Sequence, residues 1–244
     1  MFKINDSNKG IIVNTNKDEW DRSYENRDNF VFYPHEEVVR FVSKFIRKRI
    51  GLNEFRDVAL DVNENVRVLD LGCGIGRHVM YCHEMGLEAY GVDLSEAAVK
   101  VALDWGIQSG LPKAEQRVRQ GDVRQLPWQE GFFRYAVSHG VLDSMPFEIA
   151  RAACVELARV MPISGLFYCD LISGDDSQHA REFSGEEIVN SAHEKGTIQL
   201  YFNLAKIQRM IEGVFEIDEC NLVRRENVLR GGYTSRYHLV LRRI

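Results

Sequence analysis

Residues Val66–Gly76 read VRVLDLGCGIG, and this stretch decides the fold. The apolar run Val66–Leu71 predicts a buried strand. The three glycines that follow, Gly72, Gly74 and Gly76, predict a tight backbone turn that leaves unpaired N–H groups at the start of a helix. In an open parallel sheet, ligands bind in the crevice at this end of a strand. The stretch therefore predicts a strand, a ligand-binding loop and a helix in succession.

The chain on both sides of this loop alternates between helical and extended patterns. Helices are predicted at Gly76–Met85, Ser95–Ser109 and Pro146–Val160, and strands at Glu88–Val92, Arg117–Gln120, Phe132–Ser138 and Leu166–Leu171. Two further extended runs, Val214–Val223 and Tyr233–Leu241, flank Gly231 and Gly232, as in an antiparallel hairpin. The expected fold is α/β, with a doubly wound, mostly parallel seven-stranded sheet that ends in this hairpin.

The remaining segments are less regular. Residues 1–30 show no clear period and predict a loosely held arm, although its aromatic side chains indicate that it docks somewhere. Residues from Glu36 predict a helix whose expected stop is Gly51. Ser184–Glu187 matches a capping box that opens a short helix, and Asn203 is expected to cap a helix to Ile211. We expect one domain over residues 1–244, in which residues 1–50 and 172–203 cover the substrate.

Composition limits the class of protein. The 244 residues are 45% apolar and 27% charged, with a formal net charge of -5. No stretch approaches the roughly 18 uninterrupted apolar residues of a membrane helix, and the five scattered cysteines suit a reducing compartment. We therefore expect a cytoplasmic protein without a membrane partner. The absence of a long basic run favours a small-molecule substrate over a nucleic acid.

The glycine loop departs from one well-known fingerprint and fits another. A dinucleotide-binding loop would place its third glycine at position 77, which is Arg77. The residues Val68–Gly76 instead resemble the first motif of the class I S-adenosylmethionine-dependent methyltransferases, which have a Rossmann-like fold. Asp93 follows the second strand, Gly121-Asp122-Val123 follows the third, and Glu156–Pro162 with Gly165 precedes the fifth, as in that family. The resemblance covers about residues 66–171.

This resemblance implies S-adenosyl-L-methionine as the cofactor. It implies that Asp93 accepts hydrogen bonds from both ribose hydroxyls and that Asp122 and the backbone of Val123 contact the adenine. The expected cofactor-binding set is Asp70, Gly72, Cys73, Gly74, Gly76, Asp93, Leu94, Asp122, Val123 and Ser138. Two alternatives stay open from the residues themselves: Asp93 as only a helix cap, and Asp70 as a carboxylate that braces the loop.

Methyl transfer is a direct displacement that depends first on alignment, and a general base is optional. His139, at the expected end of the fourth strand, is the candidate catalytic residue, with a wall of the pocket as its alternative role. Asp143 is expected to orient His139 or to cap the helix near Pro146. His179 and His193 lie in the covering segment and are expected to face solvent.

No metal site is expected. His78 and Cys82 lie four residues apart, but a zinc site needs more ligands at tighter spacing. Asp170 ends the fifth strand without the acidic cluster of magnesium-dependent relatives.

The predicted reaction is methyl transfer to oxygen or nitrogen of a small molecule. The stretch Ser138–Val141 lacks the motifs of methyltransferases that act on nucleic-acid bases. Three alternatives remain: an RNA methyltransferase, a methyltransferase-like subunit that binds cofactor without catalysis, and, more remotely, a nicotinamide oxidoreductase. The identity of the acceptor and the oligomeric state are left open by the sequence.

Overall fold

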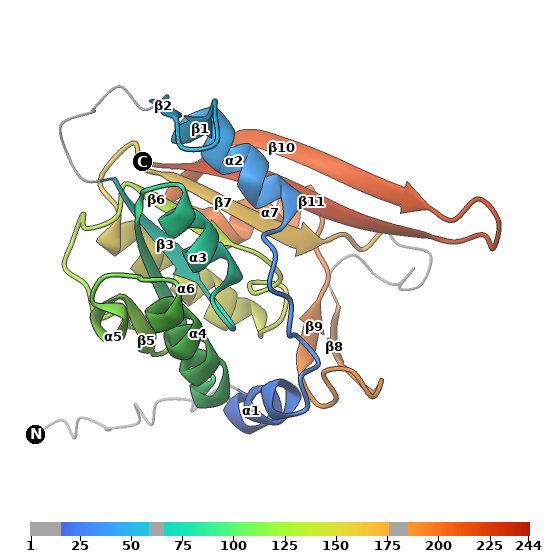
Figure 1. Cartoon of the computed structure of the whole chain (residues 1–244). Helices are drawn as coiled ribbons and strands as arrows, with labels where there is room; N and C mark the ends of the chain where they lie inside the picture. Colours follow the sequence, from blue (N-terminus) through green and yellow to red (C-terminus); the bar gives the residue numbers. More distant parts are fainter. Residues whose placement is uncertain (1–15, 59–65, 176–184) are drawn as a thin grey trace, which may run out of the picture.

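The computed structural model describes residues 16–58, 66–175 and 185–244. Its centre is a seven-stranded sheet in the order β10-β11-β7-β6-β3-β4-β5 (Figure 1). The strands are β3 (Arg67–Leu71), β4 (Glu88–Asp93), β5 (Val118–Gln120), β6 (Tyr135–Ser138), β7 (Leu166–Ile172), β10 (Phe215–Glu226) and β11 (Tyr233–Arg243). The first five are parallel, whereas β11 pairs antiparallel with β7 and β10. The expected sheet and its terminal hairpin are confirmed.

Helices cover both faces of this sheet. They are α2 (Glu36–Phe45), α3 (Arg77–Glu84), α4 (Glu96–Gln108), α5 (Ala114–Arg117), α6 (Phe147–Val160) and α7 (Leu204–Ile211). The side chain of Ser95 caps α4, and Asn203 caps α7. The predicted helices agree with α3, α4, α6 and α7 to within a few residues. The helix predicted from Glu36 ends earlier than expected, at Phe45 instead of Gly51, because a short strand begins at Arg47.

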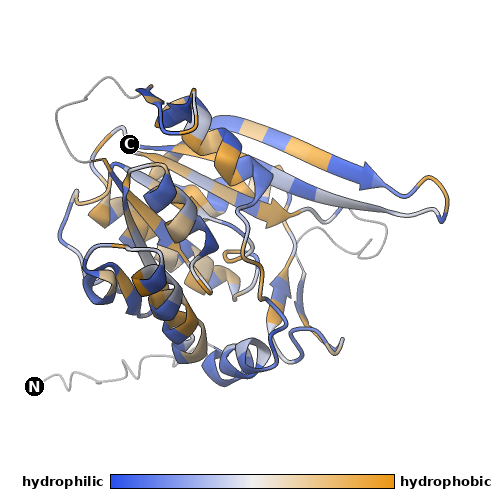
Figure 2. Cartoon of the chain, viewed as in Figure 1, coloured by the Kyte–Doolittle hydropathy of each residue, from blue (hydrophilic) through white to orange (hydrophobic). Residues whose placement is uncertain are grey.

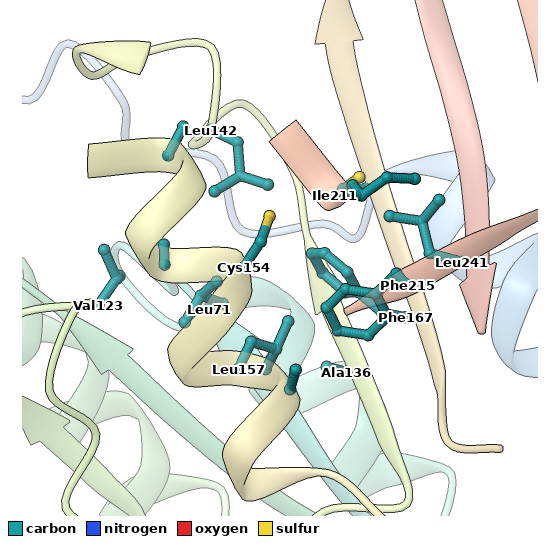
Figure 3. Packing of buried hydrophobic residues seen from close by; sticks show 14 of the residues in the cluster. Leu71, Val123, Ala136, Leu142, Cys154, Leu157, Phe167, Ile211, Phe215 and Leu241 are labelled. Atoms are coloured by element: carbon teal, nitrogen blue, oxygen red, sulfur yellow. The ribbon is translucent and has the colours of Figure 1, made fainter. Parts of the chain in front are cut away.

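Two hydrophobic clusters fill the space between the sheet and the helices. One lies under α6 and α7 and includes Leu71, Leu157 and Phe167 (Figure 3). The other lies under α2, α3 and α4 and includes Phe41 and Val79. Both faces of the central strands are covered, and nearly all residues of β3, β6 and β7 are buried. The projecting strand β10 instead shows bands of apolar and polar residues along its length (Figure 2). The packing on both faces of the central strands fixes the carboxyl ends of the parallel strands in space.

Two predictions for the irregular segments are wrong. The arm contains a helix, α1 (Lys17–Glu25), which lies beside α4 (Figure 1). The expected helix after Ser184 is a strand, β8 (Glu186–Ile188), paired with β9 (Ile198–Leu200). Ser184 itself lies outside the described residues. The capping-box pattern is outweighed because residues 186–188 gain backbone hydrogen bonds from β9.

A second small hairpin joins β1 (Arg47–Arg49) to β2 (Phe55–Asp57) after α2. All five cysteines are free thiols, and four of them are buried. Among the helices of the described residues, none combines the length and the apolar character that crossing a membrane requires.

Candidate functional site

The glycine loop between β3 and α3 has a backbone that other residues adopt only with strain. Gly72, Gly74 and Gly76 have φ angles of 75°, 53° and 90°. A Cβ atom on Gly72 would lie 2.5 Å from the side chain of Val141, and one on Gly74 would lie 2.6 Å from the hydroxyl of Tyr24. The loop is therefore glycine-rich both because it bends and because side chains approach it closely.

Asp93, at the end of β4, holds this loop. Its Oδ2 accepts a hydrogen bond from the backbone N–H of Gly74 at 2.7 Å, and its Oδ1 accepts one from the N–H of Ser95 at 2.9 Å. Burial raises the pKa of Asp93 to about 6, against the opposing effect of these two hydrogen bonds. Because Ser95 caps α4 through the N–H of Ala98, Asp93 is not the cap of that helix.

A cavity of about 270 Å³ opens where the loop and Asp93 meet. Eight of the predicted site residues line it: Gly72, Cys73, Gly74, Asp93, Leu94, Asp122, Val123 and His139. Asp122, after β5, accepts hydrogen bonds from the backbone N–H, Nε and Nη2 of Arg124, which together outweigh burial and lower its pKa. The structure thus brings the ends of four parallel strands to one cavity.

Three predicted residues lie behind this cavity rather than in its wall. The Ser138 hydroxyl donates to the Leu71 carbonyl at 3.0 Å, which ties β6 to β3. Gly76 is the N-cap of α3 and packs against Ala102. Asp70 is buried, and neither of its carboxylate oxygens has a hydrogen-bond partner in the described part of the chain.

The arm and the turn after β8 close the cavity from the opposite side. Trp20 and Tyr24 of α1 line it, together with Asn29, Val31 and Glu194. Asp21 anchors α1 by accepting from the Ser95 hydroxyl at 2.6 Å, and Asn29 donates to Glu194 at 2.8 Å. Two aromatic side chains beyond the arm lie elsewhere: Phe32 contacts Trp105 in a tilted arrangement with ring centroids 5.0 Å apart, and Tyr33 is exposed.

His139 lies at the end of β6, beside polar side chains from three other parts of the chain. Nη2 of Arg77 lies 3.1 Å from its Nδ1, Oδ2 of Asp170 lies 3.5 Å from its Nε2, and the His35 ring centroid lies 3.9 Å from its own. Burial lowers the pKa of His139 to about 3, although the Asp170 carboxylate opposes this shift. The ring is consequently neutral near pH 7.

Asp170 and Asp143 share one cation behind His139. Arg236 of β11 donates to Asp170 at 2.7 Å and to Asp143 at 2.6 Å. Burial raises the pKa of both carboxyls; for Asp170 the Arg236 guanidinium reverses this effect, so its pKa is lowered. Asp143 also accepts from the N–H of Ile172, so it neither contacts His139 nor caps α6, whose N-cap is Pro146.

Sequence reasoning missed several of these residues. Arg77 and His78 directly follow the glycine loop, and that position was a signal that could have identified them as cavity residues. His35, Arg236 and His238 carry no local signal, because α2 and β11 bring them to the site from distant parts of the chain.

The other histidines expected in the covering segment contribute less. His193 has 57% of its side chain exposed, and His179 lies outside the described residues. In the part of the chain that the structure describes, no three His, Cys, Asp or Glu side chains are arranged to hold a metal ion.

A family model described as a methyltransferase domain matches residues 68–165. An uncharacterized methyltransferase from Bacillus subtilis, YcgJ, is 32% identical over 106 residues, which cover 41% of this chain and 38% of that protein. A second relative, from Haemophilus influenzae, is 24% identical, with 48% of this chain and 47% of that protein covered. The matches thus span less than half the length of these curated relatives.

Solved structures share the fold. A SAM-dependent methyltransferase from Methanosarcina mazei matches with a TM-score of 0.59 and 18% identity, over 75% of this chain and 94% of that one. Geranyl diphosphate C-methyltransferase from Streptomyces coelicolor, solved with S-adenosyl-L-homocysteine, matches with a TM-score of 0.53 and 13% identity, over 73% and 72%. At such identities the likeness concerns the fold alone.

Proposed function

We propose that this chain, whose residues 68–165 match a methyltransferase domain, is a class I S-adenosylmethionine-dependent methyltransferase that transfers a methyl group to an oxygen or nitrogen atom of a small molecule. When bound, S-adenosyl-L-methionine supplies an electrophilic methyl group on a sulfonium. The observation that carries the proposal is the buried Asp93 carboxylate, joined to the Gly74 amide at the wall of the cavity.

Asp93 fits a ribose because of the lone pairs that it retains. An ionised carboxylate has about four acceptor positions, of which the backbone N–H groups of Gly74 and Ser95 occupy two. The two that remain suit a pair of adjacent hydroxyls. In this proposal, Leu94, Asp122 and Val123 hold the adenine, and Gly72, Cys73 and Gly74 approach the amino-acid end through their backbone.

The cavity walls supply alignment and exclude water. Trp20 and Tyr24 line the cavity with aromatic side chains, and aromatic rings attract a sulfonium as they attract other cations. The cover formed by α1 and Glu194 leaves a small space, which supports a small acceptor over a polynucleotide. His139, at the same cavity, is the residue proposed to receive a proton from the acceptor.

A second function is favoured by one observation. The only hydrogen bond to His139 within the described residues engages Nδ1, and its pKa of about 3 makes the free ring a weak base. These properties suit a subunit that binds the cofactor without transferring the methyl group. Mass-spectrometric detection of methylated products, in a metabolite pool incubated with cofactor, separates the two functions, because a binding subunit yields none.

Calorimetric titration with S-adenosyl-L-methionine tests the cofactor assignment. Asp93→Asn keeps the shape of the side chain but loses its charge, and we expect affinity to fall about 100-fold, as for two lost charge-assisted hydrogen bonds. The matched control is Asp104→Asn on the exposed side of α4, which should bind like the unaltered protein. Equal affinities for the two variants would remove Asp93 from its assigned role.

The same titration, repeated at several pH values, should show cofactor affinity falling as Asp93 takes up a proton. Because the pKa of Asp93 is about 6, affinity should decrease about tenfold per pH unit below that value. Stability of the free protein should respond in the opposite direction. The pKa of Asp93 in the folded protein, about 6, lies above the unfolded value of about 3.9. Ionisation of Asp93 therefore lowers the free energy of unfolding as the pH rises from about 3.9 to about 6. A flat affinity profile contradicts the assignment, and Asp93→Asn is the control that should lack the dependence.

A further inference from the structure

Arg77 is a cation in the cavity wall without an anionic partner. It is the only lysine or arginine among the residues that line the cavity in the described part of the chain. Within that same part, its guanidinium forms no ion pair and one hydrogen bond, from Nη2 to Nδ1 of His139. A guanidinium has five N–H donors in a fixed planar arrangement, so most of its donors remain available to a ligand.

The hydrogen bond from Arg77 determines the tautomer of His139. Because a guanidinium can only donate, Nδ1 of His139 must be the acceptor, and the neutral ring therefore carries its proton on Nε2. Nε2 lies 3.5 Å from Oδ2 of Asp170, which is too far for a hydrogen bond. The one lone pair with which His139 could accept a proton is thus occupied by Arg77.

The other groups facing His139 do not replace Arg77. His35 contacts the ring in a tilted arrangement, and its own Nδ1 accepts from the N–H of Glu37. His78 lies edge-on at 5.8 Å, and its Nε2 accepts from the N–H of His35. Among the described residues, Asp170 is the one carboxylate within ion-pair distance of the ring, and Arg236 on β11 holds it in place. The other groups near His139 are therefore held by their own contacts. Arg77, at the first position of α3, is the charged side chain that can turn from His139 to a ligand.

We infer that Arg77 binds a carboxylate or phosphate that enters the cavity and, in doing so, releases Nδ1 of His139 for use as a base. This inference rests on the proposed function. The acceptor atom then passes its proton to Nδ1 while its lone pair bonds to the methyl carbon, and the electron pair of the broken C–S bond stays on sulfur. Asp170, opposite Nε2–H, stabilises the charged ring that results.

The anion has two sources with the same chemistry: the amino-acid end of the cofactor, or an acidic group on the acceptor. The experiment uses ligands that differ in this group. S-adenosyl-L-homocysteine carries the carboxylate, whereas 5′-methylthioadenosine lacks it. Acetate or inorganic phosphate, added to protein saturated with 5′-methylthioadenosine, stands for an acidic acceptor.

The readout is the side-chain ¹⁵N spectrum of histidine, in which His139→Gln identifies the signals of His139. In the free protein we expect Nδ1 to be unprotonated and hydrogen-bonded, with the proton on Nε2. When Nδ1 is released, its ¹⁵N signal should move to the chemical shift of an unprotonated nitrogen that accepts no hydrogen bond. Release by S-adenosyl-L-homocysteine alone assigns the anion to the cofactor, and release only by acetate or phosphate assigns it to the acceptor.

Arg77→Met should give the released spectrum without any ligand and raise the pKa of His139 by about one unit. Arg134→Met, an exposed arginine before β6, is the matched control and should leave His139 unchanged. If the cofactor is the source, Arg77→Met should also weaken S-adenosyl-L-homocysteine about tenfold or more, with 5′-methylthioadenosine unaffected.

The inference is overturned if no ligand changes the His139 signal, or if the free protein already shows a released Nδ1. The ligand titrations use the unaltered chain, so they decide the matter even where Arg77→Met does not fold. Failure of the proposed function looks different, since no methylated product would then form from the metabolite pool, whether or not S-adenosyl-L-methionine binds. Acetate and phosphate titrations of the free protein would still report on Arg77 and His139.

Discussion

The glycine-loop end of the cavity (Gly72, Gly74 and Asp93) and its His139 end (His139, Asp170 and Arg236) hold their polar groups by different means. At the glycine-loop end, one carboxylate accepts from backbone N–H groups of its own neighbourhood. At the His139 end, Arg236 on β11 neutralises the carboxylates of Asp170 and Asp143, and Asp170 lies beside the neutral ring of His139. Backbone donors are fixed once the strand, loop and helix form, whereas paired side chains depend on the complete sheet.

This difference has an energetic consequence. Removing one partner from a buried ion pair leaves an uncompensated charge, which costs more than losing a single hydrogen bond. The His139 end should therefore be sensitive to changes far from it in the sequence. The glycine-loop end should respond mainly to changes in its own backbone. Three substitutions test this contrast.

Arg236→Met should have the largest effect on stability. Asp143 and Asp170 have side-chain exposures of 1% and 0%, so both carboxylates would remain buried without their cation. We expect a loss of about 3 kcal/mol in the free energy of unfolding, measured in urea near neutral pH. Adding Asp143→Asn to Arg236→Met should recover part of the loss, because one of the two buried charges is then absent.

The matched control is Arg242→Met, which lies on the same strand. Arg242 pairs with Asp218 at the surface, with 37% of its side chain exposed, and its loss should cost about 1 kcal/mol or less. Equal losses for the two arginines would show that the His139 end does not depend on its buried charges.

Gly74→Ala tests the glycine-loop end. A positive φ angle costs a residue with a Cβ about 1–2 kcal/mol, and the new methyl group would also meet the Tyr24 hydroxyl at 2.6 Å. Gly110→Ala is the control, since Gly110 has a φ of 74° but no atom within 4 Å of its Cβ position. We expect Gly74→Ala to lose more stability than the control, and cofactor affinity as well. Adding Tyr24→Phe should reduce the difference in lost stability between Gly74→Ala and the control. If this difference is unchanged, the Tyr24 hydroxyl does not clash with the new methyl group.

Ser138→Ala should have the smallest effect. Its hydroxyl makes one buried hydrogen bond to the Leu71 carbonyl, so the loss should be about 1 kcal/mol of unfolding free energy. Cofactor affinity, measured by calorimetry, should stay unchanged because Ser138 does not line the cavity. A large loss of affinity would instead place Ser138 in contact with the cofactor.

Sequence reasoning succeeded where neighbouring residues determine the geometry. The spacing of Gly72, Gly74 and Asp93 reflects one strand-helix-strand unit, whose handedness is fixed, so their meeting at one edge was predictable. It failed for α1, whose sequence is polar and lacks a clear period. That helix is anchored by the hydrogen bond between Asp21 and Ser95, which are distant in sequence. Similarly, the ion pair between Asp143 and Arg236 could not be predicted, because the two residues are distant in sequence and meet only when β11 pairs with β7.

The sequence by itself determined the parallel sheet, the glycine turn and the acid that follows the second parallel strand, because backbone sterics and hydrophobic periodicity act over a few residues. Only the tertiary structure decided which side chains surround His139. The tautomer of the His139 ring depends on its hydrogen bond with Arg77. The charge of that ring depends on its burial and on the nearby carboxylate of Asp170. Asp170 is in turn held in position by Arg236. These are electrostatic interactions across space, and their strength depends on distances that exist only after the strands have paired.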